Sequence, residues 1–127
     1  MKNYKKLPES ELETMLVVWH SEIPVRGSDL AAALFKTRGW NKSTVFTLLL
    51  RLVDRGFLSC SKEGKNNYYR PLISEEAYRA YESRSILDRF YAGSIKNFVA
   101  AFCSDNNLSK EELEQLRQLV DEQAGGR

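Results

Sequence analysis

Hydroxyl and basic side chains cluster in the middle of the chain, in a pattern suited to binding a polyanion. Lys42 stands beside Ser43 and Thr44, and Thr47 and Arg51 follow at helical spacing. Hydroxyl groups near the start of a helix can bond phosphate oxygens or base edges, and the helix dipole favours anions there. The pattern therefore predicts nucleic-acid recognition, with Lys42 as a phosphate contact.

Composition gives little support to catalysis or metal binding. The chain has one histidine, His20, and two cysteines, Cys60 and Cys103. A structural zinc site uses about four Cys or His ligands, and these three residues are scattered. A catalytic triad would have to use His20, which ends an apolar helical run. The sequence therefore predicts no enzyme activity, no metal site and no cofactor.

Basic charge is concentrated in the first part of the chain. Residues 1–73 hold 12 Lys and Arg against 7 Asp and Glu, a net charge of +5, whereas residues 74–127 hold 7 against 10, a net charge of −3. Residues 36–70 alone carry eight basic groups. The asymmetry favours a module that faces a polyanion, joined to a second module of another kind. Solvated surface charges would give the same counts.

Three short helices must position these side chains. Apolar residues recur at i, i+3, i+4 and i+7, which is typical of amphipathic helices. The pattern predicts helices over 9–20, 27–36 and 42–55. Asn41 is a good N-cap for the third helix, since its side chain can accept a bond from a free backbone N–H.

A β-hairpin follows the helices. Short strands over 57–62 and 67–72 flank a turn at 63–66 that carries Lys62 and Lys65 at its edges. Three helices followed by a hairpin is the order of a winged helix-turn-helix. In that fold the second helix of the pair enters the major groove, and the hairpin reaches the flanking backbone. The fold class expected is mainly α with a small β-hairpin.

The helix over 42–55 has one residue that the sequence leaves open. If Val45, Leu48, Leu49 and Leu52 point inward, Phe46 lies near the opposite side, where it could meet a thymine methyl group. It could equally fill space against Trp40 or Phe35. The residues predicted to contact DNA are Lys42, Ser43, Thr44, Phe46, Thr47, Arg51, Lys62 and Lys65.

The C-terminal part is rich in apolar helical residues for its size. Helices are predicted over 75–91, 94–103 and from 109 onward. Because such a short segment has little interior of its own, its apolar surface either meets a second copy or packs on the first domain. We expect a winged helix over 1–73 and a three-helix dimerisation domain over 74–127. The predicted dimer contacts are Leu87, Phe90, Tyr91, Ile95, Phe98, Val99, Phe102, Leu116, Leu119 and Val120.

Compartment and alternative functions follow from the same features. The longest apolar run, Met15 to Trp19, is far shorter than the ~20 residues of a membrane span. We therefore expect a cytoplasmic protein without membrane insertion. Two alternatives are a winged helix that binds protein rather than DNA, and a regulator released by a ligand or by a redox signal at Cys60 or Cys103.

Motifs along nearly the whole chain resemble one family. The run from Trp40 to Leu52 resembles the recognition-helix signature of the penicillinase repressor family (BlaI and MecI, with the copper repressor CopY as a cousin). The similarity covers residues 7–122 and continues through the segments 55–58, 62–65, 69–76, 87–94 and 108–113. Two cysteines cannot supply the cysteine cluster of the copper branch, so the chain is closer to BlaI and MecI.

The resemblance implies a function and a mode of release. It implies a homodimeric repressor that binds double-stranded operators of two-fold symmetry before β-lactam-resistance or related genes. Such repressors are inactivated when a membrane-bound sensor metalloprotease leads to cleavage in the dimerisation domain. The family's scissile Asn–Phe bond corresponds here to Ala101–Phe102, so Ala101 replaces the usual Asn.

Overall fold

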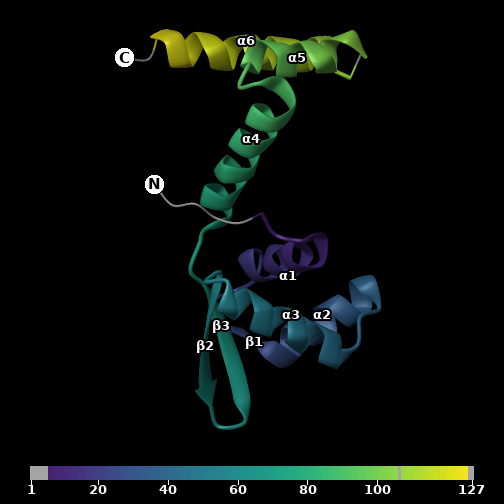
Figure 1. Cartoon of the computed structure of the whole chain (residues 1–127), viewed down its shortest axis with the longest axis vertical. Coiled ribbons are helices and arrows are strands. Elements are labelled where there is room, and N and C mark those ends of the chain that lie inside the picture. Colours follow the sequence, from purple (N-terminus) through teal and green to yellow (C-terminus); the bar gives the residue numbers. More distant parts are fainter. Residues whose placement is uncertain (1–5, 106, 126–127) are drawn as a thin grey trace. The chain divides into compact units, whose positions relative to one another are not determined.

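The chain is mainly helical with a small antiparallel sheet, as predicted, in a computed structural model that describes residues 6–105 and 107–125 (Figure 1). Its elements are α1 (Glu9–Trp19), β1 (Val25–Arg26), α2 (Gly27–Arg38), α3 (Lys42–Asp54), β2 (Leu58–Glu63), β3 (Asn66–Pro71), α4 (Glu75–Tyr91), α5 (Ile95–Ser104) and α6 (Lys110–Gly125). Among the described residues, no helix has the length and apolar character needed to cross a bilayer.

One hydrophobic core joins α1, α2, α3 and the sheet. The four residues of α3 that were predicted to point inward, Val45, Leu48, Leu49 and Leu52, are all at most 5% exposed. Val45, Leu49 and Leu52 pack with Met15 and Val18 of α1, with Leu30 and Leu34 of α2, and with Phe57, which lies between α3 and β2. The 3.6-residue period thus fixes which side of α3 is buried, and therefore which side is left to solvent.

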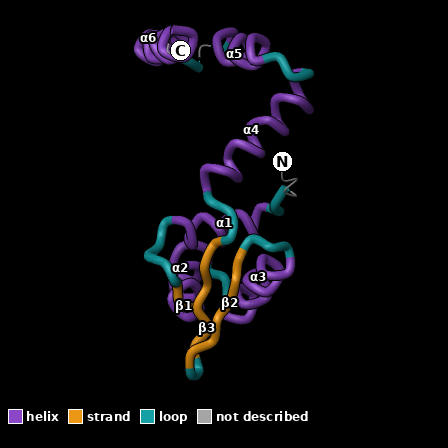
Figure 2. The backbone as a smooth tube through the Cα atoms, turned by 90° about the vertical axis from the view of Figure 1, so that its left-hand side faces the viewer, coloured by secondary structure: helices purple, strands orange, loops and turns teal. Residues whose placement is uncertain are grey.

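The sheet contains a strand that the sequence did not predict. Its order is β1-β3-β2, all antiparallel, and Val25 of β1 pairs with Tyr69 of β3 (Figure 2). A strand of two residues has no periodicity to detect. The hairpin turn lies at residues 63–66 as predicted, and both strands reach one residue further into it, because Glu63 pairs directly with Asn66 across Gly64 and Lys65. Gly64 has φ 63°, a conformation that glycine adopts without steric cost.

Both views show the hairpin tip extending beyond the helices of this unit (Figures 1 and 2). At its base, Tyr69 is 4% exposed and points into the core, whereas its neighbour Tyr68 is half-buried. This alternation is that of a strand with one face on a core. The pKa of the Tyr69 hydroxyl is raised to about 12, mainly by burial and to a smaller extent by the nearby Cys60 thiol.

The start of α4 is built into the core of the first unit. Tyr78 is 3% exposed and its ring packs on Phe57 and Trp19. The backbone N–H of Leu7 donates to its hydroxyl oxygen at 2.8 Å, and the hydroxyl donates to Glu82 Oε2 at 2.6 Å. Burial and the Glu82 carboxylate raise the pKa of Tyr78 above its usual value. These contacts tie the N-terminal segment to α4.

The chain divides into two compact units between Glu82 and Ser83, inside α4. The domain boundary expected from the sequence lay earlier, between residues 73 and 74. The difference arises because the first turns of α4 carry Tyr78, which belongs to the core of the first unit. In the second unit, Phe98 makes edge-to-face contacts with Tyr91 and with Phe102.

Candidate nucleic-acid interface

The start of α3 is a capped helix end whose positive dipole is not neutralised. Asn41 Oδ1 accepts a 2.9 Å hydrogen bond from the backbone N–H of Thr44, which confirms Asn41 as the N-cap, and a second from the Ser43 hydroxyl. The first turn holds no acidic residue. Because the remaining N–H groups and the dipole favour negative charge, this end of α3 can receive a phosphate group.

A shallow hollow of about 230 Å³ lies on α3 beside this end. Its lining consists of Ser43, Thr44, Thr47, Leu48 and Arg51, which brings four of the predicted contact residues together. The Thr47 hydroxyl donates to the Ser43 carbonyl oxygen at 3.0 Å. The Thr47 oxygen therefore keeps its lone pairs for an external donor, such as the amino group of a base.

Four of the residues predicted to contact DNA are exposed cations. Lys42 and Arg51 lie on α3, and Lys62 and Lys65 lie on the hairpin. None of the four forms an ion pair with another residue in the described ranges. Their charge is available for an external anion, which is what phosphate contacts require.

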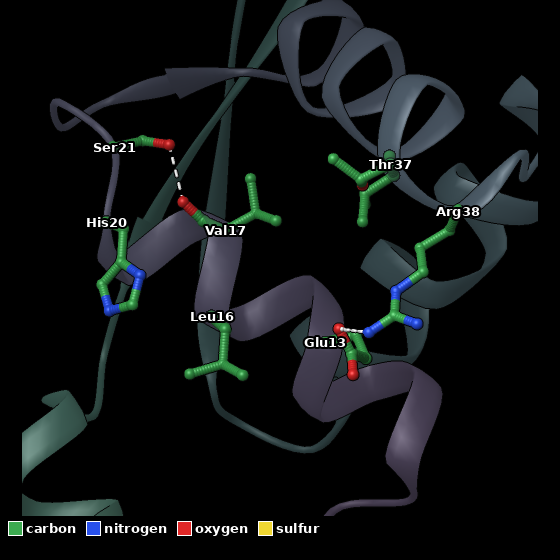
Figure 3. A pocket seen from close by; sticks show the side chains of 8 residues that line it. Glu13, Leu16, Val17, His20, Ser21, Thr37 and Arg38 are labelled. Carbon is green, nitrogen blue, oxygen red and sulfur yellow. Dashed lines mark hydrogen bonds and ion pairs between the residues drawn. The ribbon is translucent and has the colours of Figure 1, made fainter.

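Two other basic residues of the same segment are used inside the fold. Arg38 pairs with Glu13 of α1 across an open groove of about 520 Å³ (Figure 3). Arg55 Nε lies 2.6 Å from Glu11 Oε1, although this oxygen accepts no hydrogen bond from the described residues. Glu11 is only 2% exposed. The basic excess counted from the sequence therefore overstates the charge that faces outward.

Phe46 lies against the core rather than pointing freely outward. It is half-buried, and its ring edge touches Gly27 at the start of α2: a Cβ atom on Gly27 would lie 2.8 Å from Phe46 Cε1 and 3.2 Å from Tyr69 Cε2. Of the two roles considered for Phe46, this placement favours packing between elements. The glycine at position 27 makes room for the ring, and Phe35 itself is 65% exposed.

Sequence reasoning omitted one residue of the outward side of α3. Leu50 is 62% exposed, although Leu48, Leu49 and Leu52 beside it are buried. A leucine suggests core by its type. Its position, three residues after Thr47, places it on the same side as the hydroxyl groups. Helical spacing was the signal that could have found it.

The residues predicted to form a dimer interface differ in exposure within a single chain. Phe90 is 69% exposed and Ile95 61%, and Phe102, Leu119 and Val120 are also exposed. Tyr91, Phe98, Val99 and Leu116 are half-buried. Leu87 differs, because it is only 6% exposed and already packs within one chain. In the second unit, α5 and α6 contain no buried residue at all.

Comparison with known proteins identifies relatives of the whole chain. Residues 7–122 match the family described as penicillinase repressor. The penicillinase repressor of Bacillus licheniformis is 38% identical over 123 residues, which covers 96% of this chain and 94% of that protein.

Two solved structures resemble the first unit. The solution structure of the DNA binding domain of the repressor BlaI superposes with a TM-score of 0.54 and 36% identity, over 61% of this chain and 94% of that one. The monomeric form of Bacillus licheniformis BlaI in complex with the blaP half-operator gives a TM-score of 0.53, with the same identity and coverage. With its capped α3, its free cations and a family match over residues 7–122, the chain belongs to the penicillinase repressor family of winged-helix, DNA-binding transcriptional repressors, which are not enzymes.

Proposed function

We propose that this chain represses β-lactam-resistance or related genes by binding, as a homodimer, to an operator with two-fold symmetry. The observation that carries the proposal is the outward side of α3, where Ser43, Thr44, Thr47 and Arg51 line one hollow beside a capped helix end. A relative of similar structure has been solved on a half-operator. A dimer suits such DNA, because a palindromic operator mirrors the symmetry of the protein.

The residues have two kinds of role in this proposal. Ser43, Thr44 and Thr47 contact base edges or phosphates in the major groove. The exposed cations supply the backbone contacts that set affinity without reading sequence. They are Lys42, Arg51, Lys62 and Lys65.

The dimer is proposed to form through the C-terminal unit. Exposed Phe90, Ile95, Leu119 and Val120 give α4, α5 and α6 more apolar surface than a solvated helix needs. Pairing with a second copy would cover this surface and hold two winged helices on the two half-sites. Sedimentation of wild type and of Leu119→Asp is the direct test, with a dimer expected for the first and a monomer for the second.

Release is proposed to follow from proteolysis in the same unit. The family resemblance points to the bond between Ala101 and Phe102 in α5, with a membrane-bound sensor metalloprotease as the partner. Cutting α5 would remove the link between the two DNA-binding units, and the gain from binding both half-sites would be lost. Cells exposed to a β-lactam should contain a fragment that begins at Phe102; intact protein under full induction would contradict this step.

Repression itself is tested by fluorescence anisotropy on DNA from upstream of the chain's own gene, with a shuffled duplex as the control. We expect a preference of ~10³ or more for the upstream duplex and a steep loss of affinity with salt. Equal binding to both duplexes would reduce the interface to a basic surface. No binding to either would favour the winged helix as a protein-docking module.

A further inference from the structure

An exposed leucine lies in the middle of the outward side of α3. Leu50 is 62% exposed, whereas the other three leucines of α3 are at most 5% exposed. Single exposed leucines are ordinary on protein surfaces. This one is different because of its neighbours along the helix.

Helical geometry places Leu50 among the groups that face DNA in the proposed function. It lies seven residues after Ser43 and three after Thr47, spacings that return to the same side of a helix. Val45 and Leu52, on the opposite side, are fully buried. Leu50 therefore extends the row of Ser43 and Thr47 along the helix axis.

The other apolar residue near this row, Phe46, is less exposed to solvent than Leu50. Phe46 is half-buried, with its ring edge against Gly27. Thr47 has its hydroxyl proton bonded within α3, and Arg51 is a cation. Leu50 is thus the side chain of the row whose surface is entirely apolar and open to solvent.

The major groove presents one strongly apolar group, the C5 methyl of thymine. We propose that Leu50 is a specificity-determining residue that packs against a thymine methyl group of the operator. This inference rests on the proposed function and adds to it the identity of one base that α3 reads. It also transfers to Leu50 the methyl contact that the sequence had offered to Phe46.

The test removes the methyl group from the DNA and the side chain from the protein. The full-length protein is titrated with its upstream duplex, in which each thymine is replaced singly by deoxyuridine, which lacks only that methyl. For wild type, a single replacement at the contacted thymine of one half-site should weaken binding about fourfold, which is the effect of one buried methyl group. Replacement of the equivalent thymine in both half-sites should weaken binding about 15-fold. Leu50→Ala should bind the unmodified duplex more weakly and lose nothing further with deoxyuridine at that position.

Leu72→Ala is the matched control, because Leu72 is 58% exposed and lies outside α3, after β3. This variant should keep the wild-type sensitivity to deoxyuridine. Leu50→Ala with full sensitivity at every thymine would overturn the inference, as would a wild type that ignores all the replacements. Wild type that binds upstream and shuffled duplexes equally would instead overturn the proposed function, and the Leu50 contact with it.

Discussion

The side chains proposed to contact DNA have two kinds of role: some contact base edges, and others contact the phosphate backbone. Thr47 lies in the α3 hollow with its hydroxyl oriented by the Ser43 carbonyl, so its remaining contacts are directional. Lys65 lies in the turn of the hairpin, and we propose that its flexible cation contacts the phosphate backbone whatever the base sequence. Their variants should therefore change binding in different ways.

Thr47→Ala should reduce the preference for operator over random DNA, whereas Lys65→Ala should weaken binding to both duplexes by a similar factor. A lost base contact costs about 1–3 kcal/mol on the right sequence only, and a lost phosphate contact lowers the salt dependence by about one counterion. Competition anisotropy with specific and random duplexes measures both. If Thr47→Ala weakened both duplexes equally, α3 would face the DNA with another side.

Gly27 and Phe46 form a second residue-scale test. Alanine in place of a helical glycine ordinarily stabilises, but a Cβ atom here would lie 2.8 Å from the Phe46 ring. Gly27→Ala should therefore destabilise by about 1–3 kcal/mol, as overpacking does, and Phe46→Leu in the same chain should recover part of the loss. Urea denaturation measures these changes.

Gly125→Ala is the matched control, since a Cβ atom there meets nothing within 4 Å. It should leave stability unchanged or slightly improved. A Gly27→Ala protein as stable as wild type would mean that the ring moves aside freely.

Elements differ in how much of them the sequence could predict. In α3, the four buried apolar residues repeat at helical spacing and Asn41 caps the start, so both its extent and its inner side could be predicted. β1 could not, because two residues become a strand only by pairing with Tyr68 and Tyr69. The ion pairs of Arg38 and Arg55 with α1 were equally hidden, since they join residues far apart in sequence.

The buried hydroxyl of β3 predicts how stability changes with pH. The pKa of Tyr69 is about 12 in the folded chain and about 10 when unfolded. The contribution of Tyr69 to the free energy of unfolding is therefore fully present below pH 10 and is lost as the pH rises toward 12. The slope of this loss is at most about 1.4 kcal/mol per pH unit. Tyr69→Phe should remove this slope. Urea denaturation of both proteins from pH 9 to pH 11.5 measures it, and parallel curves would contradict the assignment.

At the scale of the whole molecule, the two compact units divide within a helix rather than at a loop. Tyr78 contributes to the core of the first unit, with its hydroxyl bonded to Leu7 and Glu82. The sequence predicted a boundary between residues 73 and 74, because sequence patterns mark the ends of helices and not where helices pack. The family resemblance, the winged-helix order and the outward side of α3 were accessible from sequence, whereas this division was not.

Truncated chains test the division directly. Residues 1–82 should unfold cooperatively, as expected from the relative whose DNA binding domain was solved by itself. Residues 1–73 should lose several kcal/mol, since removing Tyr78 leaves Phe57 and Trp19 without the ring on which they pack. Tyr78→Ala in residues 1–82 separates loss of the side chain from loss of the helix. Equal stability of the two truncated chains would contradict this division.

The exposed apolar surface of the second unit also ties the protein's behaviour to its abundance. Phe90, Ile95 and Val120 remain open to solvent in a single copy. If pairing covers them, it obeys mass action, and the free energy that it adds to folding grows with the logarithm of concentration. Below the dissociation constant, halving the number of copies leaves roughly a quarter of the pairs. Growth without new synthesis would then dilute the repressing species faster than the chain itself, so the amount of repressing species would fall with the square of the chain's concentration.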